Sequence, residues 1–150
     1  MPNSLVDANY WIVILTTLVV VMLCVGFHYE VLANCNRLLP HIGHRHRRRI
    51  FVLILFILFA HAIKISLFTF GYYYLIEIRE LGELTGSVSA GLTDYAYFSA
   101  VVYTTVGFGD LIPIGPVRML TSMEALTGLV MITWSASFTF LEMQRYWRPN

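Results

Sequence analysis

Charged residues are scarce in this chain of 150 residues, at 13%, whereas hydrophobic residues make up 57%. A composition with so little polar surface excludes a soluble domain. The mean hydropathy of +0.67 instead indicates an integral membrane protein. The formal net charge is only +1, so the overall charge gives no reason to expect a nucleic-acid partner.

Cysteine is also rare, and this limits the chemistry that the chain can perform. Cys24 lies within the first hydrophobic run and Cys35 follows it, without the C-x-x-C spacing of redox or zinc motifs. We expect both thiols to be reduced and structural. The sequence shows no nucleophile motif, metal constellation or phosphate-binding loop after a strand, so we expect neither an enzyme, a catalytic residue nor a cofactor.

Basic residues are missing from residues 1–9, which contain Asp7 but no lysine or arginine. Because a secretory signal peptide begins with a basic region, we expect the first hydrophobic run to be a retained helix. A membrane span needs roughly 20 apolar residues. Three runs approach that length, and they are Tyr10–Phe27, Ile50–Tyr74 and Arg118–Phe140. The sequence therefore predicts an all-α membrane protein with three transmembrane helices.

No arginine ladder repeats through the first or second run, which excludes voltage sensing by a mobile arginine helix. Basic residues cluster instead between these two runs, which predicts a cytoplasmic linker and an external N-terminus in the cell membrane. Arg145 and Arg148 place the C-terminus on the cytoplasmic side too. The linker residues concerned are Arg37, His41, His44, Arg45, His46, Arg47, Arg48 and Arg49.

This basic linker has more than one interpretation. The simplest is a topology signal that also contacts anionic lipid headgroups. An alternative is a proton or metal sensor built from His41, His44 and His46, since imidazole titrates near neutral pH. The neighbouring arginines would repel a metal cation, which argues against the metal sensor.

A polar, glycine-containing segment, Thr104–Asp110, stands between two hydrophobic runs and reads Thr-Thr-Val-Gly-Phe-Gly-Asp. Backbone carbonyls can replace the hydration shell of an ion only if successive carbonyls turn to the same side, which requires unusual φ and ψ angles. Gly107 and Gly109 supply such positions. We expect Val106 and Phe108 to point their apolar side chains away from the ion path.

This segment resembles the selectivity filter of the potassium channel pore-domain superfamily, with TVGFG where the familiar form is TVGYG. The resemblance covers Ile50–Arg148 and implies a bacterial-type pore with one pore loop per chain. It implies a homotetramer that conducts K⁺ passively through a fourfold filter. The implied K⁺-binding residues are Thr105, Val106, Gly107 and Phe108, with Gly109 completing the filter.

The resemblance also divides the chain. It implies a pore domain in residues 50–150 with an outer helix, a pore helix, the filter and an inner helix, which leaves residues 1–49 as an additional N-terminal transmembrane helix and basic cytoplasmic linker. Phe108 lacks a hydroxyl that ties the filter to the pore helix in many relatives. Two alternatives therefore stay open: a weakly selective monovalent cation channel, and a nonconducting membrane subunit of a channel assembly.

The segment before the filter predicts a short re-entrant helix. Thr93 is a candidate helix cap, and Asp94 suits the positive end of the helix dipole. The apolar run Tyr95–Tyr103 is too short to span a membrane. The preceding residues, Glu77–Thr93, are predicted to form an external loop whose acidic rim attracts cations or is simply solvated.

Several residues are candidates for supporting the filter. In relatives the acid at the position of Asp110 bonds an aromatic residue of the pore helix, and by alignment Tyr97 takes that place here. We therefore expect a hydrogen bond between the Tyr97 hydroxyl and the Asp110 carboxylate. Where some bacterial relatives have a glutamate behind the filter, this chain has Val101, so that acid pair is absent.

Two ionisable residues fall within the predicted spans at similar depth, Lys64 in the second and Glu124 in the third, as counted at about 1.5 Å per helical residue. We predict that they form a buried ion pair, with His61 as a possible third member. An alternative has Glu124 hydrogen-bonded to pore-helix hydroxyls such as Ser99 or Thr104, while Lys64 reaches toward the membrane surface.

The third span contains candidate gating residues. Gly128 falls where relatives carry the inner-helix hinge glycine, although glycine is also common in membrane helices for packing. Ile132, Ala136 and Phe140 recur at helical spacing and are predicted to line the cavity. Phe140 is the candidate for a hydrophobic constriction.

Overall fold

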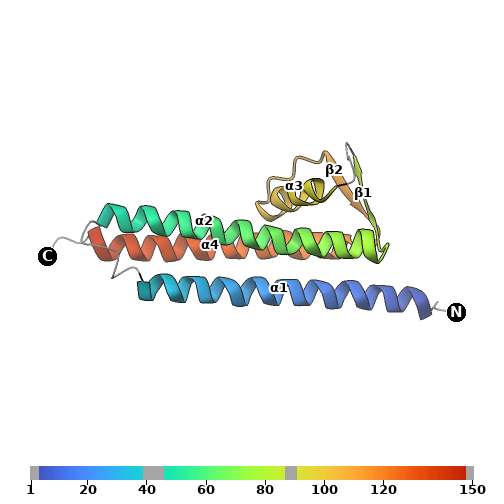
Figure 1. Cartoon of the computed structure of the whole chain (residues 1–150), viewed down its shortest axis with the longest axis horizontal. Helices are drawn as coiled ribbons and strands as arrows, with labels where there is room; N and C mark the ends of the chain where they lie inside the picture. Colours follow the sequence, from blue (N-terminus) through green and yellow to red (C-terminus); the bar gives the residue numbers. More distant parts are fainter. Residues whose placement is uncertain (1–3, 39–45, 87–90, 148–150) are drawn as a thin grey trace.

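The computed structural model describes residues 4–38, 46–86 and 91–147. Three long helices lie side by side in Figure 1: α1 (Ser4–Leu38), α2 (His46–Tyr73) and α4 (Arg118–Trp147). In the described part of the chain, these three helices are long and apolar enough to cross a membrane. The prediction of an all-α membrane protein with three transmembrane helices is confirmed.

The helices run further than the hydrophobic runs predicted, except that α4 begins at Arg118 as expected. The first helix continues past Phe27 because its last turns bury Val31, Leu32 and Cys35 against α2. The linker is correspondingly shorter. Arg37 belongs to the last turn of α1, and α2 opens with residues 46–49. His41, His44 and Arg45 lie outside the described residues.

The first helix packs against both α2 and α4, so it contacts the inner helix as well as the outer one. Near its C-terminal end, Asn36 accepts a hydrogen bond from the guanidinium of Arg145, with 3.3 Å between Nη1 and Oδ1. The same guanidinium nitrogen lies 2.6 Å from the Glu142 carboxylate. The first helix is therefore part of the subunit core rather than a peripheral anchor.

The short helix α3 (Leu92–Tyr103) has 12 residues and packs against α2 and α4. Figure 1 shows it near the end of the bundle that lies away from the C-terminus, as a re-entrant pore helix requires. Asp94 lies in its first turn as predicted. The prediction that Thr93 caps this helix is wrong, because the extended residue Gly91 is the cap and its carbonyl accepts from the Asp94 and Tyr95 amides.

The region predicted as an external loop contains regular structure. A π-helical turn, η2 (Tyr74–Ile78), prolongs α2, and the strand β1 (Glu83–Gly86) follows. This strand pairs antiparallel with β2 (Leu111–Ile114), so that Gly86 lies opposite Leu111. Gly86 has φ of +138°, and a Cβ there would overlap the carbonyl oxygen of Asp110. The segment that follows η2 is thereby joined to Asp110 and the strand that follows it.

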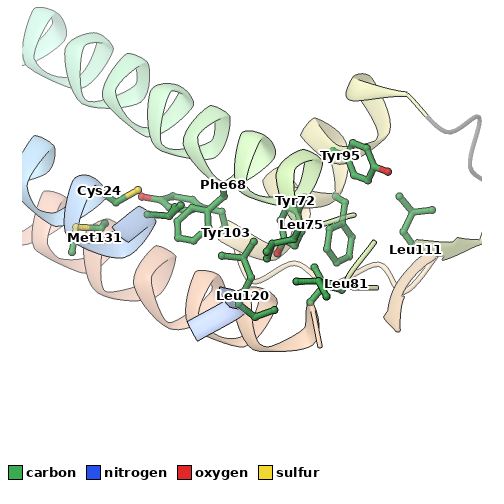
Figure 2. Close-up of a cluster of buried hydrophobic side chains, with 14 residues drawn as sticks. Cys24, Phe68, Tyr72, Leu75, Leu81, Tyr95, Tyr103, Leu111, Leu120 and Met131 are labelled. Atoms are coloured by element: carbon green, nitrogen blue, oxygen red, sulfur yellow. The ribbon is translucent and has the colours of Figure 1, made fainter. Parts of the chain in front are cut away.

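Figure 2 shows the main hydrophobic core, which lies where α2, α3 and α4 meet. Both cysteines are free and buried, and Cys24 of α1 sits at the edge of this core. The cluster includes several aromatic residues, and Tyr72 packs edge-on against Phe98 with ring centroids 5.2 Å apart. The labelled residues are Cys24, Phe68, Tyr72, Leu75, Leu81, Tyr95, Tyr103, Leu111, Leu120 and Met131.

Candidate functional site

The segment between α3 and β2 has an unusual backbone. Thr105, Gly107 and Gly109 have φ of +60°, +59° and +78°, whereas the residues between them do not have positive φ. A chain that alternates in this way turns successive carbonyls toward one side. The prediction that both glycines adopt unusual conformations is confirmed. The same conformation at Thr105 was missed, because nothing in a sequence marks a threonine for it.

The start of this segment is hydrogen-bonded to the last turn of α3. The carbonyl of Val101 accepts hydrogen bonds from the amides of Val106 at 3.1 Å and Gly107 at 3.4 Å. The Thr105 amide donates to Val102 at 2.9 Å, and the Thr104 hydroxyl donates to the Ala100 carbonyl at 2.7 Å. The pore helix therefore fixes the start of the segment through backbone groups, without an acidic side chain at position 101.

The outer end is held by a side chain of the same helix. The Tyr97 hydroxyl donates to Oδ2 of Asp110 at 2.8 Å, which confirms the predicted hydrogen bond. This bond to a carboxylate raises the pKa of Tyr97. Nearby, the hydroxyl of the buried Tyr95 donates to Glu77 of η2, and burial raises the pKa of Tyr95. The two bonds hold α3 to Asp110 and to η2.

The apolar side chains of the segment are not covered by their own chain. Val106 is 56% exposed and Phe108 is 70% exposed. Both glycines have open space where a Cβ would be, so their role within one chain is conformational and not steric. Within the part of this chain that the structure describes, nothing covers these two apolar side chains.

The buried carboxyl of Glu124 lies behind the segment. The Tyr72 hydroxyl is 2.5 Å from Oε2, and the Ser99 hydroxyl is 2.5 Å from Oε1. Tyr72 also lies 3.2 Å from the hydroxyl of Thr121. Glu124 thus joins the outer helix, the pore helix and the inner helix at one point. The alternative expectation for Ser99 is confirmed, whereas Thr104 bonds to its own helix instead.

The predicted ion pair between Lys64 and Glu124 is wrong. Lys64 is fully buried and its Nζ lies 2.7 Å from Nδ1 of His28 in α1. It does not reach toward the membrane surface either. Counting residues along two helices gives the depth of a side chain but not the direction in which it points. Lys64 faces α1, whereas Glu124 faces α3.

His61 does not join Glu124, and no sequence signal pointed to its actual partners, Tyr103 and Ser135. Its Nδ1 lies 2.9 Å from the Tyr103 hydroxyl, and its Nε2 lies 3.0 Å from the Ser135 hydroxyl. Tyr103 is the last residue of α3, and Ser135 belongs to α4. His61 therefore links the end of the pore helix to the inner helix.

Gly128 lies where α4 crosses the end of α3. A Cβ at this position would overlap the carbonyl oxygen of Tyr103 and would stand 2.8 Å from the carbonyl carbon. Close packing is therefore a sufficient reason for glycine here, and its role as a hinge stays a prediction. Figure 2 shows the Tyr103 side chain within the hydrophobic core.

The other candidate gating residues share one hollow. Ile132, Ala136 and Phe140 line a largely apolar space of about 480 Å³ between α2 and α4, which extends to Thr104 at the end of α3. Their common face is as predicted, and their part in gating stays a prediction. In the described ranges, no group of three or more His, Cys, Asp or Glu residues is placed to hold a metal ion.

Comparisons with known proteins point to an ion channel. Residues 50–145 match the model of a family described as "Ion channel". A similar curated protein is the inward rectifier potassium channel Kirbac3.1 of Paramagnetospirillum magnetotacticum, which is 39% identical over 59 residues. That match covers 39% of this chain and 19% of the relative, so the chain spans about a fifth of that protein. No solved structure matches the chain.

Proposed function

The chain belongs to the ion channel family, and from that premise we propose that it is a potassium-selective channel that conducts K⁺ passively down its gradient. The observation that supports this most directly is the positive φ at Thr105, Gly107 and Gly109. That alternation is what a strand needs in order to present a column of carbonyl oxygens to a dehydrated cation. The carbonyls concerned belong to Thr105, Val106, Gly107 and Phe108.

The conducting unit in this proposal is a homotetramer. One strand provides oxygens on only one side of an ion, whereas a K⁺ filter surrounds the ion with four strands. The exposure of Val106 and Phe108 supports this, because neighbouring copies would cover both side chains. Residues 50–150 then form the pore domain, and residues 1–49 contribute the additional helix and the basic linker.

The orientation proposed for the cell membrane follows from the basic residues. Arg37, Arg47 and Arg145 lie near the ends of α1, α2 and α4 that gather at one end of the bundle in Figure 1. The positive-inside rule assigns that end to the cytoplasm. The N-terminus is then external and the C-terminus cytoplasmic. The filter and the paired strands face the outside.

The decisive experiment measures ion flux from liposomes that contain the purified full chain, under a K⁺ gradient and then under a Na⁺ gradient. The wild-type chain should pass K⁺ and discriminate strongly against Na⁺. Gly107→Ala should abolish this discrimination, because an L-residue in the left-handed region is strained by about 1–2 kcal/mol in each of four subunits. Gly26→Ala is the matched control, since a Cβ at this helical position meets nothing.

The outcomes separate the candidate functions. Equal K⁺ and Na⁺ flux would show a weakly selective cation channel. An absence of flux from a correctly folded chain would favour a nonconducting subunit. The assembly is measured separately by the mass of the detergent-solubilised complex, and a monomer or dimer that conducts would contradict the fourfold filter.

A further inference from the structure

A buried cluster of polar side chains joins all four helices just inside the filter. His28 comes from α1, His61 and Lys64 from α2, Tyr103 from α3 and Ser135 from α4. The His28 and His61 rings have centroids 5.8 Å apart. The proposed function gives this cluster no role, although burying so many polar groups is costly unless each is hydrogen-bonded.

The hydrogen-bond donors and acceptors around His61 determine which of its ring nitrogens carries the proton. The Ser135 hydroxyl donates to the Met131 carbonyl at 2.9 Å, so its oxygen is left to accept. His61 must then donate from Nε2 to Ser135 across 3.0 Å. A neutral imidazole has one donor and one acceptor, so Nδ1 is the acceptor. The Tyr103 hydroxyl therefore donates to Nδ1 across 2.9 Å.

The same reasoning applies to His28. The Lys64 ammonium can only donate, so Nδ1 of His28 accepts its hydrogen bond at 2.7 Å and Nε2 carries the proton. In the described residues this Nε2 is a buried side-chain nitrogen without a hydrogen-bond partner. The ring packs edge-on with Trp134 of α4, with centroids 5.1 Å apart. The first helix thus places a neutral imidazole next to His61.

We propose that His61 is a positioning residue whose neutral form holds the end of the pore helix to the inner helix, and whose protonation releases it and lowers ion flux. This inference rests on the proposed channel function. A protonated imidazole has two N–H donors and no acceptor. Its bond to Ser135 survives, but the bond from the Tyr103 hydroxyl is lost because two donors face each other.

The release acts at the start of the filter. Tyr103 directly precedes Thr104 and Thr105, and its carbonyl lies against Gly128. Without the bond to His61, the last turn of α3 has one less contact to fix the filter. An imidazolium at this place also adds a positive charge near the inner end of the ion path, which repels cations. Both effects reduce conduction.

Protons can reach His61 from the hollow between α2 and α4. The side chain is partly buried and lines this space of about 480 Å³ together with Tyr103, Thr104 and Ser135. The hollow also includes Ile132, Ala136 and Phe140, the predicted cavity residues. If these residues face the ion path, then His61 senses the proton concentration of the cytoplasmic side.

The groups around His61 leave an added charge uncompensated. The titratable neighbours are His28 on α1, Lys64 on α2 and Tyr103 on α3. On α4 the ring meets the neutral Ser135, and the carboxyl of Glu124 is occupied by Tyr72 and Ser99. Among the described residues, no carboxylate contacts the ring. A protonated His61 therefore gains no ion pair in place of the hydrogen bond that it loses.

The first test is K⁺ flux from liposomes over the range from about pH 8 to about pH 3, which extends below the ordinary titration of imidazole because protonation of His61 breaks a buried hydrogen bond. Wild-type flux should fall about tenfold and recover when the pH is restored, as expected for the loss of a buried hydrogen bond. His61→Gln cannot titrate, so its flux should not change over this range. A variant with alanine at His41, His44 and His46 should keep the wild-type pH dependence.

Two results would overturn the proposal. One is a His61→Gln variant that conducts with the wild-type pH dependence. The other is a triple-alanine variant that loses this dependence while His61→Gln keeps it, since the sensor would then be the linker.

The second test does not depend on conduction. Nitrogen NMR of histidine-labelled protein in lipid should show His61 as the neutral Nε2–H tautomer at neutral pH, with its signals identified by their absence in His61→Gln. Tyr103→Phe should shift the Nδ1 signal, because the donor is removed. The opposite tautomer, or an unchanged Nδ1 signal in Tyr103→Phe, would refute the assignment. A chain that conducts at no pH would refute the proposed channel function. The NMR result would still show whether His61 makes the hydrogen bonds described.

Discussion

Replacing Gly128 by alanine tests whether this residue is needed for close packing or for bending. The added Cβ would overlap the Tyr103 carbonyl oxygen, and it would stand 2.8 Å from the carbonyl carbon and 3.0 Å from the Cα. Ordinary contacts of a Cβ begin near 3.4 Å. The backbone at the end of α3 cannot rotate away like a flexible side chain. The inner helix must therefore move away from the pore helix.

The magnitude follows from a comparison with Gly26→Ala. Both changes replace a helical glycine by alanine, which favours the helix by about 0.5–1 kcal/mol in each case. That gain is common to the two variants and cancels in their difference. A Cβ at position 26 meets nothing, whereas the Cβ at position 128 overpacks the interface at a cost of about 1–3 kcal/mol. Gly128→Ala should therefore be less stable than Gly26→Ala by about 1–3 kcal/mol.

The assay is denaturant unfolding of the two purified variants in the same detergent, followed by far-ultraviolet circular dichroism. Equal stabilities would refute the close-packing argument. If Gly128→Ala also changed channel opening without any loss of stability, the hinge interpretation would stand instead. A loss of stability alone would leave glycine at this position explained by the contact with the pore helix.

The remaining predictions concern the supports of the filter and the orientation of the chain. Tyr97→Phe removes the hydroxyl that donates to Asp110 and should lower the K⁺ over Na⁺ preference about threefold in the liposome assay. Glu124→Ala leaves two buried hydroxyls without their acceptor and opens a cavity, so it should destabilise the fold by about 2–4 kcal/mol, whereas Glu124→Gln should cost less in denaturant unfolding. Reversing both charges, Lys64→Glu with Glu124→Lys, should not rescue the assembly lost in either single variant, as judged by the mass of the complex. A cysteine replacing the exposed Glu83 should react with a membrane-impermeant maleimide added to intact cells, because the proposed orientation places residue 83 outside the cell. The two native cysteines are buried and should not react.

Each of these has a clear contrary result. An unchanged ion preference in Tyr97→Phe would mean that the hydroxyl does not steady the filter. Equal stability of the alanine and glutamine variants at position 124 would show that the hydrogen bonds to this side chain do not stabilise the fold. Rescue of the assembly by the double reversal would show that Lys64 and Glu124 form an ion pair, contrary to the structure. Labelling only after the cells are broken would show that residue 83 is cytoplasmic, which is the opposite of the proposed orientation.

The sequence was informative wherever the signal is local. Hydropathy located three spans and the start of α4 at Arg118, and the glycines marked two of the three left-handed positions. The Tyr97–Asp110 bond was predictable because both residues lie in segments that resemble a known family. Thr105 was not predictable, since a threonine with φ of +60° is imposed by its surroundings.

Long-range geometry was harder to predict from the sequence. Lys64 and Glu124 lie at similar depth, yet a residue count does not give the rotation of one helix about its axis relative to another. The strands β1 and β2 were missed because each has only 4 residues, and β2 contains Pro113. Proline and glycine in so short a run indicate a turn, and only the pairing between the two segments makes them strands.

The contact between Asn36 and Arg145 has a consequence for how such a pore opens. Because α1 packs along α4 and bonds to it near its C-terminal end, that end cannot move away from α1 without breaking this contact. Either the two helices travel together or their shared interface separates first. In the proposed channel, the energetic threshold for opening is then set partly by a helix outside the pore domain.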